Sequence, residues 1–118
     1  MTTVTVPIRI ESLNKTYSEH WRVRSNRNTS HRWEIHAALK AAKAPHGMLP
    51  CTVTLTRIAP RAIDQHDNLR AGFKSAVDAI AWWLGVDDAD PRVVWRYAQS
   101  RGEPKQYAAR IAIERAAP

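Results

Sequence analysis

Residues 68–84 read NLRAGFKSAVDAIAWWL, and their apolar positions recur at the spacing of an α-helix. At about 100° per residue, the apolar side chains gather on one face: Leu69, Phe73, Ala76, Val77, Ile80 and Leu84. A helix that buries this face is therefore expected. At least one of Trp82 and Trp83 is expected in the core, because a tandem pair exposes at most one ring without penalty.

The segments around this helix alternate apolar and polar residues, which is typical of β-strands. Residues 51–59 read CTVTLTRIA, and residues 93–99 and 106–113 alternate on either side of SRGEPK. The last two segments are expected to form a terminal β-hairpin. Residues 2–10 also alternate, and Pro7 favours an edge position for that strand.

Residues 11–29, ESLNKTYSEHWRVRSNRNT, are rich in Lys and Arg and show no convincing period, so they are expected to form an exposed basic arm. A helix should follow, capped by Thr29 or Ser30 and continuing to about Ala44. Its apolar face is expected to hold Trp33, Ala37 or Ala38, and Ala41.

The expected order of elements is strand, helix, strand, helix, strand, strand. This order predicts an α/β (α+β) fold with a small mixed sheet of about four strands and two main helices packed on it. A chain of 118 residues is long enough for one core but too short for two. Residues 1–118 are therefore expected to form a single domain.

The composition favours a polyanionic partner. The chain has 18 Lys and Arg against 11 Asp and Glu, a net charge of +7, and neutralising phosphates releases counterions. The single Cys51 excludes an internal disulfide and is expected to be a buried thiol. The sequence has no apolar run of membrane-spanning length and no signal-peptide pattern. We therefore expect a cytoplasmic protein with no membrane partner and no organic cofactor.

Acidic residues lie at both ends of the helical segment, with Asp64 and Asp67 before it and the pair at 87–88 after it. On a helix starting near Asp67, this residue, Lys74 and Asp78 would lie within about 40° of one another. Carboxylates suit a hard cation such as Mg²⁺. The cation would polarise a phosphoryl oxygen and activate water, while Lys74 stabilises developing negative charge. The pattern predicts a metal site for phosphodiester hydrolysis.

A simpler interpretation stays open, in which Asp67 caps the helix, Asp64 lies in a turn, and Lys74 and Asp78 form a solvated ion pair worth a few tenths of a kcal/mol. The adjacent carboxylates at 87–88 favour the metal site, because clustered like charges are costly unless a cation neutralises them.

Two nearby residues are weaker candidates. Asp90 precedes Pro91 and is expected to form a turn. His66 is a lone loop histidine, which more often lies on the surface than at a metal.

Four short motifs resemble the RusA family of Holliday junction resolvases, which includes phage-encoded members. They are Asp67-Asn68-Leu69, Lys74-x-x-x-Asp78, Gly85-Val86-Asp87-Asp88 and Ser12-Leu13-Asn14-Lys15. The order of the expected elements also agrees over nearly the whole chain. The resemblance implies a homodimer that resolves four-way DNA junctions by paired nicks, in recombination and repair, with Mg²⁺ or Mn²⁺ held by three Asp. It also implies a bacterial protein, and phage or prophage origin is compatible with it.

By this resemblance, Asp67 and Asp88 are the second and third metal ligands and Lys74 is the catalytic lysine. The family usually has Asp-x-Asp-Asn-Leu, which places Gln65 at the first ligand, so Asp64 takes that role only if the loop bulges. The interval from Asn68 to Lys74 is also three residues longer than in the best-known bacterial member. Asp87 is the alternative ligand to Asp88, and Asn68 and Asp78 are supporting residues.

The expected DNA contacts are Asn14, Lys15, Arg22, Arg24, Arg27 and Arg70. Tyr17 and Trp21 would stack on unpaired bases, although a solvated arm with Trp21 against the sheet is an equal alternative. The leading hypothesis is a metal-dependent endodeoxyribonuclease. The main alternative is a catalytically inactive RusA-like protein that binds branched or single-stranded DNA, and a purely structural interaction module is a third.

Overall fold

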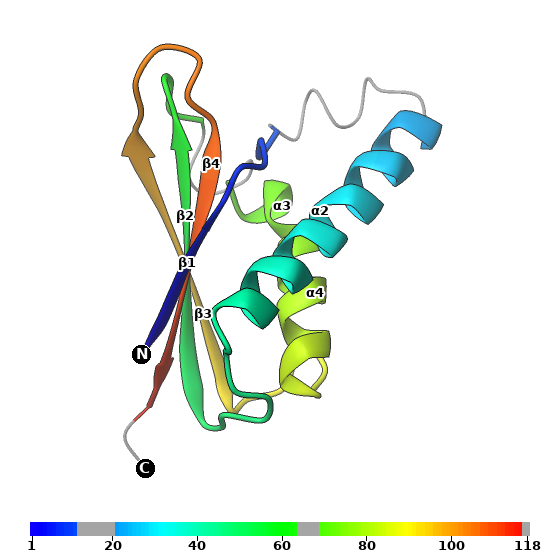
Figure 1. The fold of residues 1–118 in the computed structure, drawn as a ribbon, viewed down its shortest axis with the longest axis vertical. Coiled ribbons are helices and arrows are strands. Elements are labelled where there is room, and N and C mark those ends of the chain that lie inside the picture. Colours follow the sequence, from blue (N-terminus) through cyan, green and yellow to red (C-terminus); the bar gives the residue numbers. More distant parts are fainter. Residues whose placement is uncertain (12–20, 64–68, 117–118) are drawn as a thin grey trace.

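In the computed structural model, one four-stranded sheet carries the described helices on one face (Figure 1). The structure describes residues 1–11, 21–63 and 69–116. The strands are β1 (Thr2–Val6), β2 (Cys51–Ala59), β3 (Val93–Arg101) and β4 (Ala108–Arg115), and the helices are α2 (Trp21–Ala41), α3 (Arg70–Gly72) and α4 (Lys74–Leu84). None of the helices in these ranges is long and apolar enough to cross a membrane.

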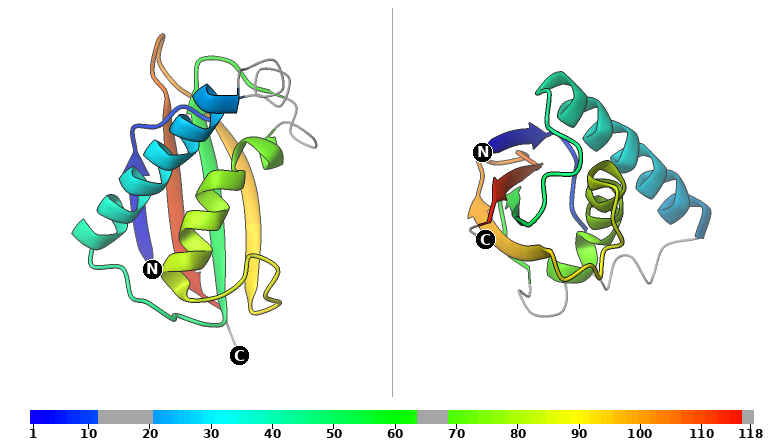
Figure 2. Two further views of the ribbon diagram at one scale, coloured as in Figure 1. Left: turned by 90° about the vertical axis from the view of Figure 1, so that its right-hand side faces the viewer. Right: turned by 90° about the horizontal axis from the view of Figure 1, so that it is seen from below.

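The strand order is β1-β4-β2-β3. β4 runs antiparallel to both β1 and β2, whereas β2 and β3 are parallel and are joined by a crossover through α3 and α4. Figure 2 shows α2 and α4 side by side over the same face of the sheet. The predicted α+β class, the four-stranded mixed sheet and the edge position of the first strand are confirmed.

The predicted terminal hairpin is wrong, because β2 lies between β3 and β4. The helical crossover places β3 on one side of β2, so β4 pairs on the other side. The connecting segment therefore passes over the end of β2, where the Gly102 N–H donates to the Ala59 carbonyl oxygen at 2.9 Å. Alternation identifies a strand, but it does not identify the neighbouring strand.

The predicted start of the first helix is also wrong. α2 begins at Trp21 rather than near Thr29 or Ser30, and it ends at Ala41. Residues 21–29 of the expected basic arm are thus helical, and the remainder, from residue 12 to 20, lies outside the described residues. Arginine has a high helix propensity, so an Arg-rich stretch can continue a helix without an apolar face to mark it.

The buried face of α2 differs from the predicted one. His31, Ile35 and Leu39 are buried, whereas Trp33 is 70% exposed. Ala38 packs partly against the core, but Ala37 and Ala41 are exposed. Trp33 is a large apolar residue that the fold leaves at the surface, and its position in the sequence therefore predicted the wrong face.

The predicted buried face of the helical segment that follows β2 is confirmed. All six residues of its apolar face are buried, and Trp83 is in the core at 8% exposure while Trp82 is 69% exposed. The segment is divided at Phe73 into α3 and α4. Gly72 allows the N-terminal segment to lie close to α3, since a Cβ at this position would lie only 2.6 Å from the Glu11 carbonyl oxygen.

His31 gives the fold a pH-dependent stability. It is 8% exposed, and its Nδ1 has no hydrogen-bond partner in the part of the chain that the structure describes. Burial, then the charge of Arg27, lowers the pKa of His31, and Glu11 opposes this effect. Because the unfolded state takes up the proton first, the free energy of unfolding should fall as pH drops below about 6.5, until the folded-state pKa is passed.

We expect His31→Leu to remove this component. Urea unfolding of both proteins between neutral and mildly acidic pH would measure it. Equal losses of stability in the two proteins over that range would contradict the assignment.

Candidate functional site

Three charged side chains meet where α4 begins. The Lys74 ammonium lies 3.1 Å from an oxygen of Asp78 and 2.6 Å from an oxygen of Asp88. Asp78 is one helical turn after Lys74, so their contact follows from helix geometry. Asp88 comes from the loop that follows α4. We refer to Lys74, Asp78 and Asp88 as the Lys74 cluster.

The turn after α4 brings Asp88 to Lys74. Gly85 adopts a left-handed conformation, with φ of 77°, and its N–H donates to the Trp82 carbonyl oxygen. The Trp95 indole N–H donates to the Asp88 carbonyl oxygen at 3.0 Å, which fixes this loop to β3. The cluster is therefore supported by the helix and the sheet together.

The charges of the cluster stabilise one another. Hydrogen bonds to Asp88 and then to Asp78 raise the pKa of Lys74, and the bond from Lys74 lowers the pKa of Asp88. Lys74 and Asp88 therefore both remain charged at neutral pH. The side chains of Lys74, Asp78 and Asp88 are 65%, 45% and 35% exposed, so these pairs add little stability and are open to a ligand.

Asp87 and Asp90 are engaged in the turn itself. One Asp87 oxygen accepts the Ala89 backbone N–H at 2.9 Å. Asp90 accepts the backbone N–H and two guanidinium N–H groups of Arg92 at 2.8–3.1 Å, and these bonds lower the pKa of Asp90 to about 2. The prediction that Asp90 forms a turn is confirmed, and of the pair at 87–88 it is Asp88 that contacts Lys74.

Several predicted site residues lie outside the described residues: Asp64, His66, Asp67, Asn68, Asn14 and Lys15. The predicted line of three charged residues is therefore described only for Lys74 and Asp78. Within the described ranges, no group of three or more His, Cys, Asp or Glu side chains is placed to hold a metal ion.

The structure describes only some of the side chains in α2 and α3 that were predicted to contact DNA. Arg22 and Arg24 belong to α2, where the structure describes the side chains only from residue 26 onward. Arg27 is half-buried. Arg70, four residues before Lys74, is exposed, and its guanidinium carbon lies 5.9 Å from the centre of the Tyr97 ring. Of these arginines, Arg70 is the one that shares a neighbour with the Lys74 cluster, because the charges of Arg70, Lys74 and Asp88 all act on Tyr97.

Sequence analysis missed a row of polar and aromatic residues on β3. Trp95, Tyr97 and Gln99 alternate along this strand on the face that carries the helices, a signal that their spacing of two contained. Gln99 makes two hydrogen bonds of 2.9 Å with the backbone of Ile63, one to its N–H and one to its carbonyl oxygen. Gln99 thus holds the chain just before residues 64–68, the segment with the first two candidate ligands.

An open groove of about 430 Å³ adjoins the cluster between α2 and α4. Its lining residues are Arg32, Trp33, His36, Asp78 and Trp82. The His36 and Trp82 rings lie 4.8 Å apart, and the His36 Nε2 is 3.0 Å from the Ala79 carbonyl oxygen. The groove shares Asp78 with the cluster and has two exposed tryptophans.

The sequence matches no family model and none of the curated proteins with which it was compared.

Proposed function

We propose that this protein is a Mg²⁺- or Mn²⁺-dependent endodeoxyribonuclease of the RusA type, which resolves four-way junctions and related branched DNA by paired nicks in recombination and repair. The observation that carries the proposal is the Lys74 cluster. It combines a charged ammonium and two accessible carboxylates, and it follows closely on a segment that contains Asp64 and Asp67.

The donor chemistry of the cluster fits a hard cation, because carboxylate oxygens are the ligands that Mg²⁺ prefers. Asp88 would hold the metal together with Asp64 and Asp67, whose carboxylates the sequence supplies. Asp87 is the less suitable ligand, since one of its oxygens already closes a turn. When bound, the metal supplies charge stabilisation at the phosphoryl oxygens and lowers the pKa of a water molecule.

Lys74 has a separate role in this proposal. Its ammonium carries three N–H donors on a flexible stem, and it can turn from Asp88 towards an oxygen of the scissile phosphate. A preorganised cation there stabilises the negative charge that develops during phosphoryl transfer. Before DNA binds, Lys74 keeps Asp88 ionised, because its hydrogen bond lowers the pKa of that carboxylate.

The charge of the chain and the position of Arg70 support DNA as the substrate. The net charge is +7, and Arg70 lies exposed four residues before Lys74, where it would contact phosphate. Paired nicks require two active sites, so we also propose a homodimer, with the exposed Trp33 and Trp82 as its candidate contact surface. We propose a cytoplasmic location in a bacterial host and include phage or prophage origin in this proposal.

A synthetic four-way junction, labelled on each strand in turn, tests the proposal. We expect symmetric nicks in Mg²⁺ or Mn²⁺ and none in EDTA, because the metal stabilises the charge of the transition state. Light scattering should give the mass of a dimer. Tight, salt-sensitive binding without nicks in either metal would overturn the nuclease and would favour the alternative, a catalytically inactive junction or single-strand binder.

A further inference from the structure

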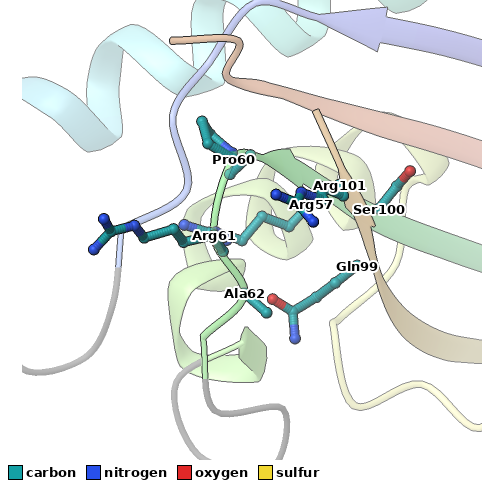
Figure 3. Close-up of a pocket in the computed structure, with 8 residues that line it drawn as sticks. Arg57, Pro60, Arg61, Ala62, Gln99, Ser100 and Arg101 are labelled. Atoms are coloured by element: carbon teal, nitrogen blue, oxygen red, sulfur yellow. Dashed lines mark hydrogen bonds between the residues drawn. The ribbon is translucent and has the colours of Figure 1, made fainter. Parts of the chain in front are cut away.

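A second hollow, of about 330 Å³, lies at the carboxyl ends of the parallel strands β2 and β3 (Figure 3). Arg57, Arg61 and Arg101 are among its lining residues, together with Gln99 and Ser100, and none of the described lining residues is acidic. A hollow with three arginines and no carboxylate attracts anions. We refer to it as the arginine pocket.

The sheet register builds this pocket. Arg57 pairs with Gln99, and Ala59 pairs with Arg101, in the parallel β2-β3 ladder. Paired residues place their side chains on the same face of a sheet, so Arg57, Gln99 and Arg101 share the face that carries the helices. The Lys74 cluster lies over that same face.

Arg57 is held rigidly in the wall of the pocket. It is 8% exposed, its Nε donates to the Ile10 carbonyl oxygen at 3.0 Å, and its Nη1 donates to the Arg61 carbonyl oxygen at 2.6 Å. These bonds use two of the five N–H donors of the guanidinium. Burial lowers the pKa of Arg57, and the charge of Glu11, which is itself 3.0 Å from Arg9, opposes this effect.

A guanidinium fixed in this way is suited to phosphate, because its planar fork matches two phosphate oxygens and loses little freedom on binding. Arg101 is exposed at the end of β3 and adds a second cation. Figure 3 shows the side chain of Arg61 extending away from the other labelled residues, so it would meet a longer ligand at the rim.

We propose that the arginine pocket binds a phosphodiester of the DNA strand whose scissile phosphate lies at the Lys74 cluster. This inference deepens the proposed function and rests on it for the choice of DNA as the source of the phosphate.

β3 sets the distance between the two sites. The Trp95 indole N–H donates to the Asp88 carbonyl oxygen, and Tyr97 is close enough to Lys74 and Asp88 for their charges to act on it. Arg101 lies four to six residues further along the strand, about 13–20 Å away at the usual rise per residue. That length corresponds to about four to six nucleotides of one strand in a duplex arm. The pocket would therefore fix the register of an arm relative to the cut.

Arg101→Ala tests the pocket, and Arg110→Ala is the matched control. Arg110 is an exposed arginine of the same sheet, but it pairs with Thr56 and so lies on the face without helices. Binding of a fluorescent four-way junction is measured in EDTA against salt concentration. We expect Arg101→Ala to weaken binding several-fold. It should also reduce by about one the slope of the logarithm of the binding constant against the logarithm of the salt concentration. Arg110→Ala should leave this slope unchanged.

Equal slopes for Arg101→Ala and the original protein, or equal effects of the two substitutions, would overturn the proposal. Inorganic phosphate forms a second arm of the experiment, because a free phosphate offers the same chemistry as a phosphodiester. If it displaces the junction at concentrations similar to those of an unlabelled oligonucleotide, the pocket is a site for free phosphate and the DNA assignment is wrong.

The binding assay separates this inference from the nuclease proposal, because no cleavage occurs in EDTA. A protein that nicks junctions in Mg²⁺ but binds them equally well after Arg101→Ala would keep the proposed function and lose the pocket. A protein that cuts nothing but loses binding through Arg101→Ala alone would keep the pocket and lose the nuclease.

Discussion

Lys74→Ala is expected to slow junction cleavage by about two to three orders of magnitude, the usual cost of removing one preorganised donor from a charged transition state. Binding of the junction should change little, because one of 18 basic residues is lost. Single-turnover cleavage in Mg²⁺ and binding in EDTA measure the two quantities separately. A loss confined to cleavage assigns the effect to the chemical step.

Asp88→Asn should produce a loss of similar size, since it removes the carboxylate charge and keeps the side-chain volume. Asp90→Asn is the matched control. Asp90 lies in the same loop, but it contacts Arg92 and not the Lys74 cluster, so its substitution should leave the cleavage rate nearly unchanged. Cleavage at the original rate by either Lys74→Ala or Asp88→Asn would contradict the assignment of the site.

Phe73→Ala is expected to lower the free energy of unfolding by about 3–5 kcal/mol, the range for removing a buried aromatic ring. Phe73 is fully buried between α3 and α4, and its ring centre lies 6.0 Å from that of Tyr97. The substitution would leave a cavity directly beneath the start of α4, where Lys74 is located. Urea unfolding monitored by circular dichroism measures the change.

Trp82→Ala provides the comparison. This side chain is larger than that of Phe73 but is 69% exposed, so its loss should change the stability by less than about 1 kcal/mol. If Trp82→Ala proves as destabilising as Phe73→Ala, the described arrangement of α4 is wrong. Loss of dimer mass with intact monomer stability would instead support the proposed contact surface.

The parts of the fold that sequence could predict are those with a strong local period. The alternation in residues 51–59 and the apolar face of residues 68–84 depend on neighbours a few positions apart, and both match the structure. Strand neighbours depend on contacts between distant segments, so the hairpin of β3 and β4 was wrongly predicted. The start of α2 was missed because its first half has many arginines and little apolar periodicity.

The contacts of the candidate site are likewise of two kinds, those that follow from local spacing and those that depend on the fold. The contact of Lys74 with Asp78 follows from their spacing of four residues. The contact of Lys74 with Asp88 depends on how the chain turns back at Gly85, and the arginine pocket depends on the register of two parallel strands. Neither arrangement has a local signature, so only the folded chain reveals them.

The position of β4 has a consequence for the order in which the protein can be assembled. Thr2 pairs with Ile113, and β4 is the strand that links β1 to the rest of the sheet. Among the described strands, β1 is synthesised before the others, and it therefore has no partner in this sheet until residues 108–115 have been synthesised. Contacts of such long sequence separation slow folding, and the exposed edge of β1 must stay unpaired throughout translation of the intervening chain.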